Sequence, residues 1–354
     1  MDKIASFRMM WVVFLVACVS GITRDDLFSS LPHIETSFAN PCVCMPFTQC
    51  PESYQQLKAS FSLKESRESK HYKRSSEICS GYFDVCCKVE CGMHKDQTIK
   101  EKILGEADAA DFAEFPWMLG ILKGLSYKCG ASLIHPKVAL TAAHCVSSPG
   151  KYTVRAGEWN WEHTHEPLPH QDREVQSMII HPKFDPSTLS NDIALLVLDD
   201  PFYLINNVGI ICVPPRNLQI DTRLCTISGW GKNSFRKGTY QPLLRKLNLP
   251  IVPRDYCVNN LREVALGPYY TLHESFLCAG GESHKDTCKG DGGSPLVCPV
   301  EGQNRFEQVG IVSWGIRCGT TENTPGVYVN VALFSDWIDE GIQHLSLNTK
   351  IYRY

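Results

Sequence analysis

The sequence lacks a second long apolar segment, N-glycosylation sites and any marked excess of charge. After the first twenty residues there is no stretch of about 18 uninterrupted apolar residues, so no membrane span is expected in the mature chain. No Asn-x-Ser/Thr site occurs, so N-glycosylation is not expected. The net charge of −3 at pH 7 gives no sign of nucleic-acid binding. The 354 residues, 43% of them hydrophobic, can form one domain of about 200–250 residues and a smaller module.

The chain begins like a secreted protein. Residues 1–20 carry Lys3 and Arg8 before an apolar run from Met9 to Val19, which is typical of a cleaved signal peptide. A buried strand or a membrane anchor is the alternative. One of the 17 cysteines, Cys18, lies in this segment, and the other 16 form an even number suited to disulfides in an oxidising compartment. We therefore expect an extracellular, disulfide-bonded protein.

Residues 42–87 hold six cysteines, in the strings CVCMPFTQC and ICSGYFDVCC. So short a segment cannot build a sufficient apolar core and needs three disulfides, whose pairing the spacing leaves open among 15 arrangements. A zinc site is the rival interpretation, but only one histidine, His71, lies nearby. The basic, serine-rich stretch 63–77 is either a flexible loop that a trypsin-like protease cuts after Lys73 or Arg74, or a merely solvated loop.

The residue pattern changes from Ile103 onward. Short apolar runs such as IALLVL, LCTISGWG and VGIVSWG are separated by Gly, Pro, Asn and Asp turns. This pattern predicts an all-β domain of many short strands, a sandwich or a barrel. A helical signal occurs only near FSDWIDEGIQHL at the C-terminal end.

Three segments carry residues suited to hydrolytic chemistry. LTAAHC places His144 after a strand end, and NDIALL places Asp192 at the start of a buried strand, where its carboxylate can orient an imidazole. GDGGSP, residues 290–295, supplies a glycine turn whose N–H groups suit an oxyanion hole. Each segment alone is commonly structural. Together and in this order they indicate a general base, its orienting group and the turn that presents a nucleophile.

These segments, with SGWG, KDTCKGD, VSWG and TPGVYVNV, strongly resemble the chymotrypsin/trypsin family of serine proteases from about Ile103 to Gln343. The resemblance implies two six-stranded β-barrels with the site in the cleft between them. The family motif Gly-Asp-Ser-Gly-Gly-Pro reads Gly-Asp-Gly-Gly-Ser-Pro here, so the nucleophile position is Gly292. Ser294 stands two residues too late, and misplacement by even 1 Å costs on the order of 100-fold in rate. We therefore expect an inactive protease homologue.

The resemblance also implies binding roles around the missing nucleophile. Asp286 aligns with the acidic pocket floor of trypsin-like members, and Gly315 and Gly326 align with the pocket walls. Such a pocket, if open, could hold Arg or Lys, and the alternative is a collapsed relic. Gly290 and Gly292 match the oxyanion-hole turn.

Activation and metal binding are implied in the same way. Asp291 matches the residue that pairs with a new N-terminus, which here would be Ile103 after cleavage at Lys102. Glu158 and Asn160 match part of a Ca²⁺ loop found in family members, although the later carboxylates do not align cleanly. No cofactor is expected to be required.

The cysteines complete the resemblance. In the protease-like part the implied pairs are Cys91–Cys212, which would tether the N-terminal part, and Cys129–Cys145, Cys225–Cys298, Cys257–Cys278 and Cys288–Cys318. The remaining six resemble a clip domain, the knotted module found before arthropod haemolymph proteases. The implied pairs there are Cys42–Cys86, Cys44–Cys79 and Cys50–Cys87.

The implied organisation is a signal peptide (1–20), a clip domain (42–87), an activation segment (88–102), a protease-homologue domain (103–343) and a tail (344–354). A clip module with glycine in place of the serine resembles the clip-domain serine protease homologues. This implies a haemolymph cofactor in melanisation and innate immunity that is cut by an upstream trypsin-like clip protease. It would then self-oligomerise and present prophenoloxidase to its activating protease.

Two alternatives remain at this point. One is an enzyme with residual or relocated activity, using Ser294 or a water activated by His144. The other is a decoy or recognition protein whose Asp286 pocket or clip module holds a basic peptide or a microbial ligand.

Overall fold

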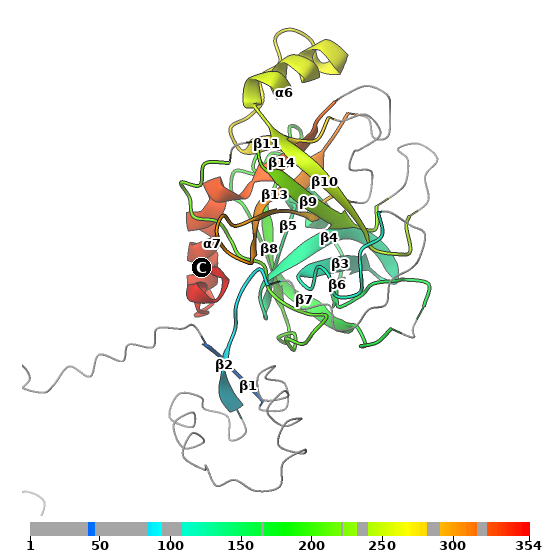
Figure 1. Ribbon diagram of the computed structural model, residues 1–354, viewed down its shortest axis with the longest axis vertical. Helices are drawn as coiled ribbons and strands as arrows, with labels where there is room; N and C mark the ends of the chain where they lie inside the picture. The colour runs from blue at the N-terminus through cyan, green and yellow to red at the C-terminus, as the bar shows by residue number, and fades with distance from the viewer. Residues whose placement is uncertain are drawn as a thin grey trace, which may run out of the picture. The chain divides into compact units, whose positions relative to one another are not determined.

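A computed structural model, drawn in Figure 1, describes residues 42–46, 84–93, 108–163, 166–220, 222–231, 240–281, 291–316 and 324–354. Part of the sequence interpretation lies outside these residues. It comprises the signal peptide, Lys73, Arg74, Lys102, Ile103, Asp286, Gly290 and the pair Cys288–Cys318.

The first barrel is a closed antiparallel sheet in the order β3-β4-β5-β8-β7-β6. Its strands are β3 (Met118–Lys123), β4 (Ser126–His135), β5 (Val138–Thr141), β6 (Tyr152–Ala156), β7 (Gln171–Ile180) and β8 (Ala194–Leu198). The apolar runs VALT and ALLVL form β5 and β8 and are buried along their whole length. Such continuous runs suit strands that are covered on both faces.

The second barrel closes in the order β10-β11-β14-β13-β12-β9. Its strands are β9 (Leu224–Gly229), β10 (Arg245–Val252), β11 (Phe276–Ala279), β12 (Pro295–Pro299), β13 (Phe306–Trp314) and β14 (Gly326–Asn330). The prediction of two six-stranded barrels is confirmed.

The helical prediction is partly wrong. The expected C-terminal helix is present as α7 (Ser335–His344), preceded by the 3₁₀ turn η3 (Val331–Phe334), and a short helix α5 (Ala143–Val146) follows β5. No sequence pattern indicated α6 (Arg254–Leu261) or the π-helical turn η2 (Arg262–Leu266) that continues it. Only Cys257 and Leu261 of α6 are buried, so its apolar face is too narrow to be recognised from periodicity.

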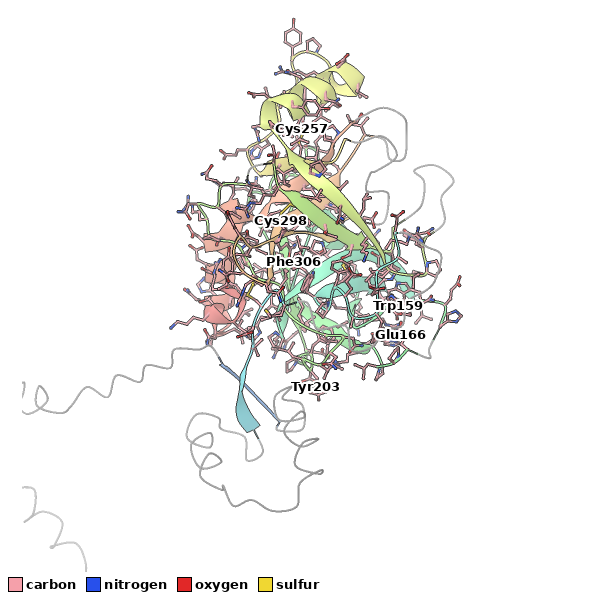
Figure 2. The ribbon with its side chains drawn as sticks, in the orientation of Figure 1. Trp159, Glu166, Tyr203, Cys257, Cys298 and Phe306 are labelled. Carbon is pink, nitrogen blue, oxygen red and sulfur yellow. A yellow bond between two sulfur atoms is a disulfide. The ribbon has the colours of Figure 1, made fainter. Side chains whose placement is uncertain are left out.

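Four disulfides lie in the described part of the chain, and they coincide with four of the pairs that the resemblance implied. They are Cys91–Cys212, Cys129–Cys145, Cys225–Cys298 and Cys257–Cys278. The Cys257–Cys278 disulfide joins α6 to β11, and Cys257 is labelled in Figure 2.

The C-terminal tail packs against the barrels. Its 3₁₀ turn η4 (Thr349–Tyr352) buries Tyr352 completely, and the Tyr352 carbonyl accepts a hydrogen bond from the Val213 N–H. The Arg353 guanidinium donates to the carbonyls of Val213 and Pro214, at 2.9 Å each. The last residues of the chain are therefore part of the folded domain.

Strands β1 (Cys42–Pro46) and β2 (Asp84–Lys88) pair antiparallel with each other, with Cys44 opposite Cys86 along the backbone. The side chains of these strands, and with them the expected clip disulfides, lie outside what the structure describes. Among the described residues there is no helix with the length and hydropathy needed to cross a bilayer.

Candidate functional site

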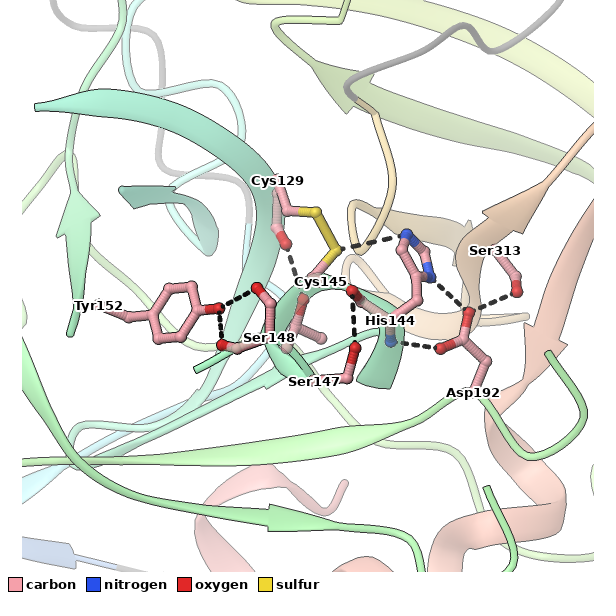
Figure 3. The surroundings of a disulfide bond; sticks show 10 residues. Cys129, His144, Cys145, Ser147, Ser148, Tyr152, Asp192 and Ser313 are labelled. Carbon is pink, nitrogen blue, oxygen red and sulfur yellow. Dashed lines mark hydrogen bonds and ion pairs between the residues drawn. A yellow bond between two sulfur atoms is a disulfide. The ribbon is translucent and has the colours of Figure 1, made fainter. Parts of the chain in front are cut away.

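His144 and Asp192 meet at the junction of the two barrels. His144 lies in α5 directly after β5, and its Nδ1 is 2.7 Å from Oδ2 of Asp192 (Figure 3). The His144 backbone N–H also donates to Asp192 Oδ1, at 2.8 Å. Asp192 is fully buried, whereas 29% of the His144 side chain is exposed. The two residues therefore have the geometry of a general base and its orienting carboxylate.

Ser313 completes the hydrogen bonds of this carboxylate. Its hydroxyl donates to Asp192 Oδ2 at 2.6 Å from the second barrel, near the end of β13. The sequence interpretation did not assign Ser313 a role, although it stands in the VSWG segment that carried the resemblance. A charge-assisted bond of this length holds the carboxylate firmly in place.

Gly292 faces Nε2 of the imidazole, the ring nitrogen that is turned away from Asp192. A Cβ built on Gly292 would lie 2.8 Å from His144 Nε2, closer than real Cβ atoms come to a neighbour. The Gly292 carbonyl accepts a hydrogen bond from the Gly130 N–H at 2.9 Å, which fixes the turn against the first barrel. The position that the resemblance assigns to the nucleophile thus carries no side chain, and the imidazole lies close against it.

Ser294 is not available as a replacement nucleophile in this arrangement. It is 0% exposed, and its hydroxyl oxygen lies against the backbones of Gly130 and Gly229. An ideal Cβ on Gly229 would be 3.2 Å from this oxygen. The hydroxyl is therefore enclosed between the two barrels, where no substrate has access to it.

Asp291 also points into the protein. Its Oδ1 accepts a hydrogen bond from the Gly231 N–H at 2.8 Å. Burial raises the pKa of the Tyr127 hydroxyl, and the Asp291 carboxylate raises it further, so the two groups lie close together. The sequence did not indicate that Tyr127 lies beside Asp291, because this proximity depends on the packing of the barrels.

The predicted pocket walls are only partly described. Gly326 begins β14 and Gly315 follows β13, and a Cβ on Gly315 would meet no atom within 4 Å. The acidic floor, Asp286, lies outside the described residues. Whether the pocket binds a basic side chain therefore stays a prediction.

Arg155 contacts the loop that carries the expected Ca²⁺ ligands, Glu158 and Asn160. Its guanidinium donates to Glu158 Oε2 at 3.2 Å and makes a bidentate pair with Asp172 at 2.8 and 2.9 Å. Glu166 Oε1 accepts hydrogen bonds from the Asn160 N–H and the Trp159 N–H, at 2.7 and 2.9 Å. Trp159 and Glu166 are labelled in Figure 2.

Two places in the described residues bear on metal binding. Calcium needs six to eight oxygen ligands, and the Glu158 carboxylate is already paired with the Arg155 guanidinium. Binding of Ca²⁺ by this loop stays a prediction. The only described cluster with metal-ligand spacing is Cys129, His144 and Cys145, and its two sulfur atoms are joined in a disulfide.

The charge state of Glu166 predicts a pH-dependent stability. Burial, followed by the nearby Glu158 carboxylate, raises the pKa of Glu166 to about 7, from 4.5. The folded state therefore holds a proton that the unfolded state releases, so stability should fall as the pH rises from about 4.5 to about 7. Because Glu166 is only half-buried, screening reduces the effect to about 1 kcal/mol.

The substitution Glu166→Gln should remove this dependence, since an amide oxygen can accept the same two backbone hydrogen bonds. At pH 8 we expect the variant to melt about 2–4 °C above the wild type, and at pH 5 at the same temperature. Thermal unfolding at both pH values checks this. The control is Glu162→Gln at an exposed neighbouring position, which should leave the melting temperature unchanged at both pH values. Equal shifts in both variants would contradict the assignment to Glu166.

The comparisons with known proteins agree with this fold and site. Residues 104–338 match the family model described as Trypsin, and the chain belongs to this family. It is 46% identical to phenoloxidase-activating factor 2 of Galleria mellonella, over 75% of this chain and 92% of that relative.

Two further relatives come from Anopheles gambiae. The inactive CLIP domain-containing serine protease A28 is 39% identical to this chain, over 73% of this chain and 69% of the relative. The inactive CLIP domain-containing serine protease A8 is 33% identical, over 92% of this chain and 94% of the relative. Within the trypsin family, the chain is thus a clip-domain serine protease homologue.

Proposed function

We propose that this protein is a secreted, catalytically inactive cofactor of prophenoloxidase activation, with Gly292 in the nucleophile position. The observation that carries the proposal is an assembled His144–Asp192 pair that faces a glycine. The name of the Galleria relative, a phenoloxidase-activating factor, supports the pathway, and the names of the two Anopheles relatives support the inactivity. The protein therefore acts by binding, in arthropod haemolymph.

Proteolytic processing would switch the cofactor on. An upstream trypsin-like clip protease would cut at Lys73, Arg74 or Lys102, and Ile103 would then become the N-terminus that pairs with Asp291. The disulfide Cys91–Cys212 supports retention of the N-terminal part after a cut at Lys102. Self-oligomerisation would follow cleavage.

The test combines the cleaved protein with prophenoloxidase and its activating protease. We expect phenoloxidase activity to rise at least about tenfold over the two components alone, because a presenting cofactor raises the effective concentration of substrate at the protease. The uncleaved protein is the control and should give a much smaller increase. No increase with the fully cleaved protein would overturn the cofactor role.

The two other functions have less support. Catalysis through Ser294 needs an accessible hydroxyl, and Ser294 is fully buried; catalysis by a water that His144 activates has no observation in its favour. Recognition of a basic peptide or a microbial ligand rests on the Asp286 pocket or the clip module, and neither Asp286 nor the clip side chains are among the described residues.

We further propose that the cofactor role requires no metal. Any Ca²⁺ bound at Glu158 and Asn160 would compete with the Arg155 guanidinium for Glu158. Its affinity would therefore be weak, in the millimolar range of low-affinity sites.

A further inference from the structure

One continuous part of the chain carries no negative charge. Between Glu114 and Glu158 the sequence has no Asp or Glu, and its basic residues are Lys123, Lys128, Lys137, Lys151 and Arg155. This stretch runs from β3 to β6 and includes His144. Arg155 is paired with Glu158 and Asp172, and Lys137 lies in the turn between β4 and β5. The other three lysines, Lys123, Lys128 and Lys151, lie in another part of the first barrel.

These three lysines, Lys123, Lys128 and Lys151, lie in or near the hairpin turn between β3 and β4. Lys123 pairs with Ser126, so the turn consists of Gly124 and Leu125, with Gly124 at a positive φ of 63°. The register of β3 with β6 pairs Lys123 with Tyr152, which brings Lys151 beside Gly124. We call Lys123, Leu125, Lys128 and Lys151 the basic tip.

Lys128 is turned outward by an irregularity in the sheet. Leu122 pairs with Tyr127 and Ile121 with Cys129, so Lys128 is an extra residue on β4 and has no partner on β3. A bulge of this kind redirects a side chain, and such bulges are frequent beside functional sites. Lys128 and Lys151 are both exposed.

Leu125 lies at the end of the hairpin with 102% relative exposure, the largest value among the large apolar side chains of the described residues. A single exposed leucine needs no explanation. Here the fully exposed leucine stands in the same turn region as three lysines, in a stretch of chain with no carboxylate. It offers an apolar anchor close in the fold to the exposed Lys128 and Lys151.

The backbone of the basic tip is anchored on both sides. The Lys123 ammonium donates to the Pro149 carbonyl at 2.8 Å and to the Ser148 hydroxyl at 3.3 Å, which fastens the hairpin to the loop before β6. The disulfide Cys129–Cys145 fastens β4 to α5, and Figure 3 shows Ser148 and Tyr152 beside it. A preordered surface loses little conformational entropy when it binds.

We propose that the basic tip is a docking surface for an acidic segment of a partner protein, in which carboxylates flank an apolar side chain. The carboxylates pair with Lys128 and Lys151, and the apolar side chain packs on Leu125. Charge complementarity of this kind speeds encounter and fixes register. A sulfated polysaccharide would use the lysines but not the leucine, so the leucine favours a protein. The proposal rests on the proposed function only in that the partner belongs to the same cascade.

The experiment uses the cleaved full-length chain in three forms besides the wild type. Lys128→Glu with Lys151→Glu reverses the charge, and Leu125→Ser removes the anchor. Lys183→Glu with Lys350→Glu is the control, because it changes the net charge equally at two exposed lysines on other elements. Each protein is titrated into the phenoloxidase assay, where activity is measured. It is also titrated into a solution of a fluorescent peptide that carries one leucine flanked by glutamates, where binding is measured. Thermal melting confirms that every variant is folded.

We expect the charge-reversed tip to raise the half-maximal concentration in both titrations roughly tenfold or more, and Leu125→Ser to raise it by a similar factor. The control should match the wild type. If both tip variants match the wild type while the wild type still enhances phenoloxidase, the docking surface is wrong and the cofactor role stands.

If the wild type gives no enhancement but binds the peptide through the tip, the cofactor role is wrong and the docking surface stands. If charge reversal weakens retention on a heparin column while Leu125→Ser changes neither titration, the ligand is a polyanion and the protein partner is overturned.

Discussion

A variant with Gly292→Ser and Ser294→Gly is expected to react covalently with a fluorophosphonate after cleavage at Lys102, while the natural protein stays unlabelled. The His144–Asp192 pair is already assembled at 2.7 Å, so only the nucleophile is missing. The loss of such a nucleophile costs about 10⁶-fold in kcat. Because the new Cβ would lie 2.8 Å from His144 Nε2, the imidazole must move by a few tenths of an ångström. We therefore expect partial recovery, on the order of 10³-fold above the natural protein.

The control adds His144→Ala to the double variant, which should abolish the labelling because the hydroxyl then has no base. In-gel fluorescence and intact mass measure the label. Labelling of the natural protein that disappears with Ser294→Ala would contradict the inactivity, since it would mean that the buried hydroxyl reaches the reagent.

Replacing Cys91 and Cys212 by serine is expected to free the N-terminal fragment when the chain is cut at Lys102. In the natural protein this disulfide spans 121 residues and is fully buried. Cleaved wild type should therefore run as one species on a denaturing gel until reductant is added, and the variant as two. A closed loop of this size contributes about 4–5 kcal/mol to stability, so the uncut variant should also unfold at a lower temperature.

The matched control replaces Cys257 and Cys278, which are only 21 residues apart. It should lose about 3 kcal/mol and release no fragment. Release of the fragment from the wild type without reductant would refute the tether.

Local apolar runs predicted an all-β domain, and the resemblance of the motifs implied the two barrels and the places of His144, Asp192 and Gly292. Buried strands such as β5 and β8 appear as short continuous apolar runs, and the site residues stand at the ends of such runs. Helix α6 was missed because only Cys257 and Leu261 of it are buried.

The remaining contacts join residues that are far apart in the chain. Ser313 reaches Asp192 across 121 positions, and the enclosure of Ser294 depends on Gly130 in the other barrel. No local pattern encodes such contacts, since they exist only when the two barrels are packed together.

The hydrogen bonds of Asp192 show why loss of the histidine would cost more folding stability than loss of the nucleophile. The buried carboxylate accepts bonds from the ring and the backbone of His144 and from Ser313. Removal of a partner from a buried charge costs about 3–5 kcal/mol, so loss of the histidine would endanger folding. Loss of the nucleophile leaves no buried group without a partner. Folding alone is therefore a sufficient reason to keep the histidine and the aspartate where the nucleophile is absent, and a genome survey that counts proteases by these two residues will also count inactive homologues.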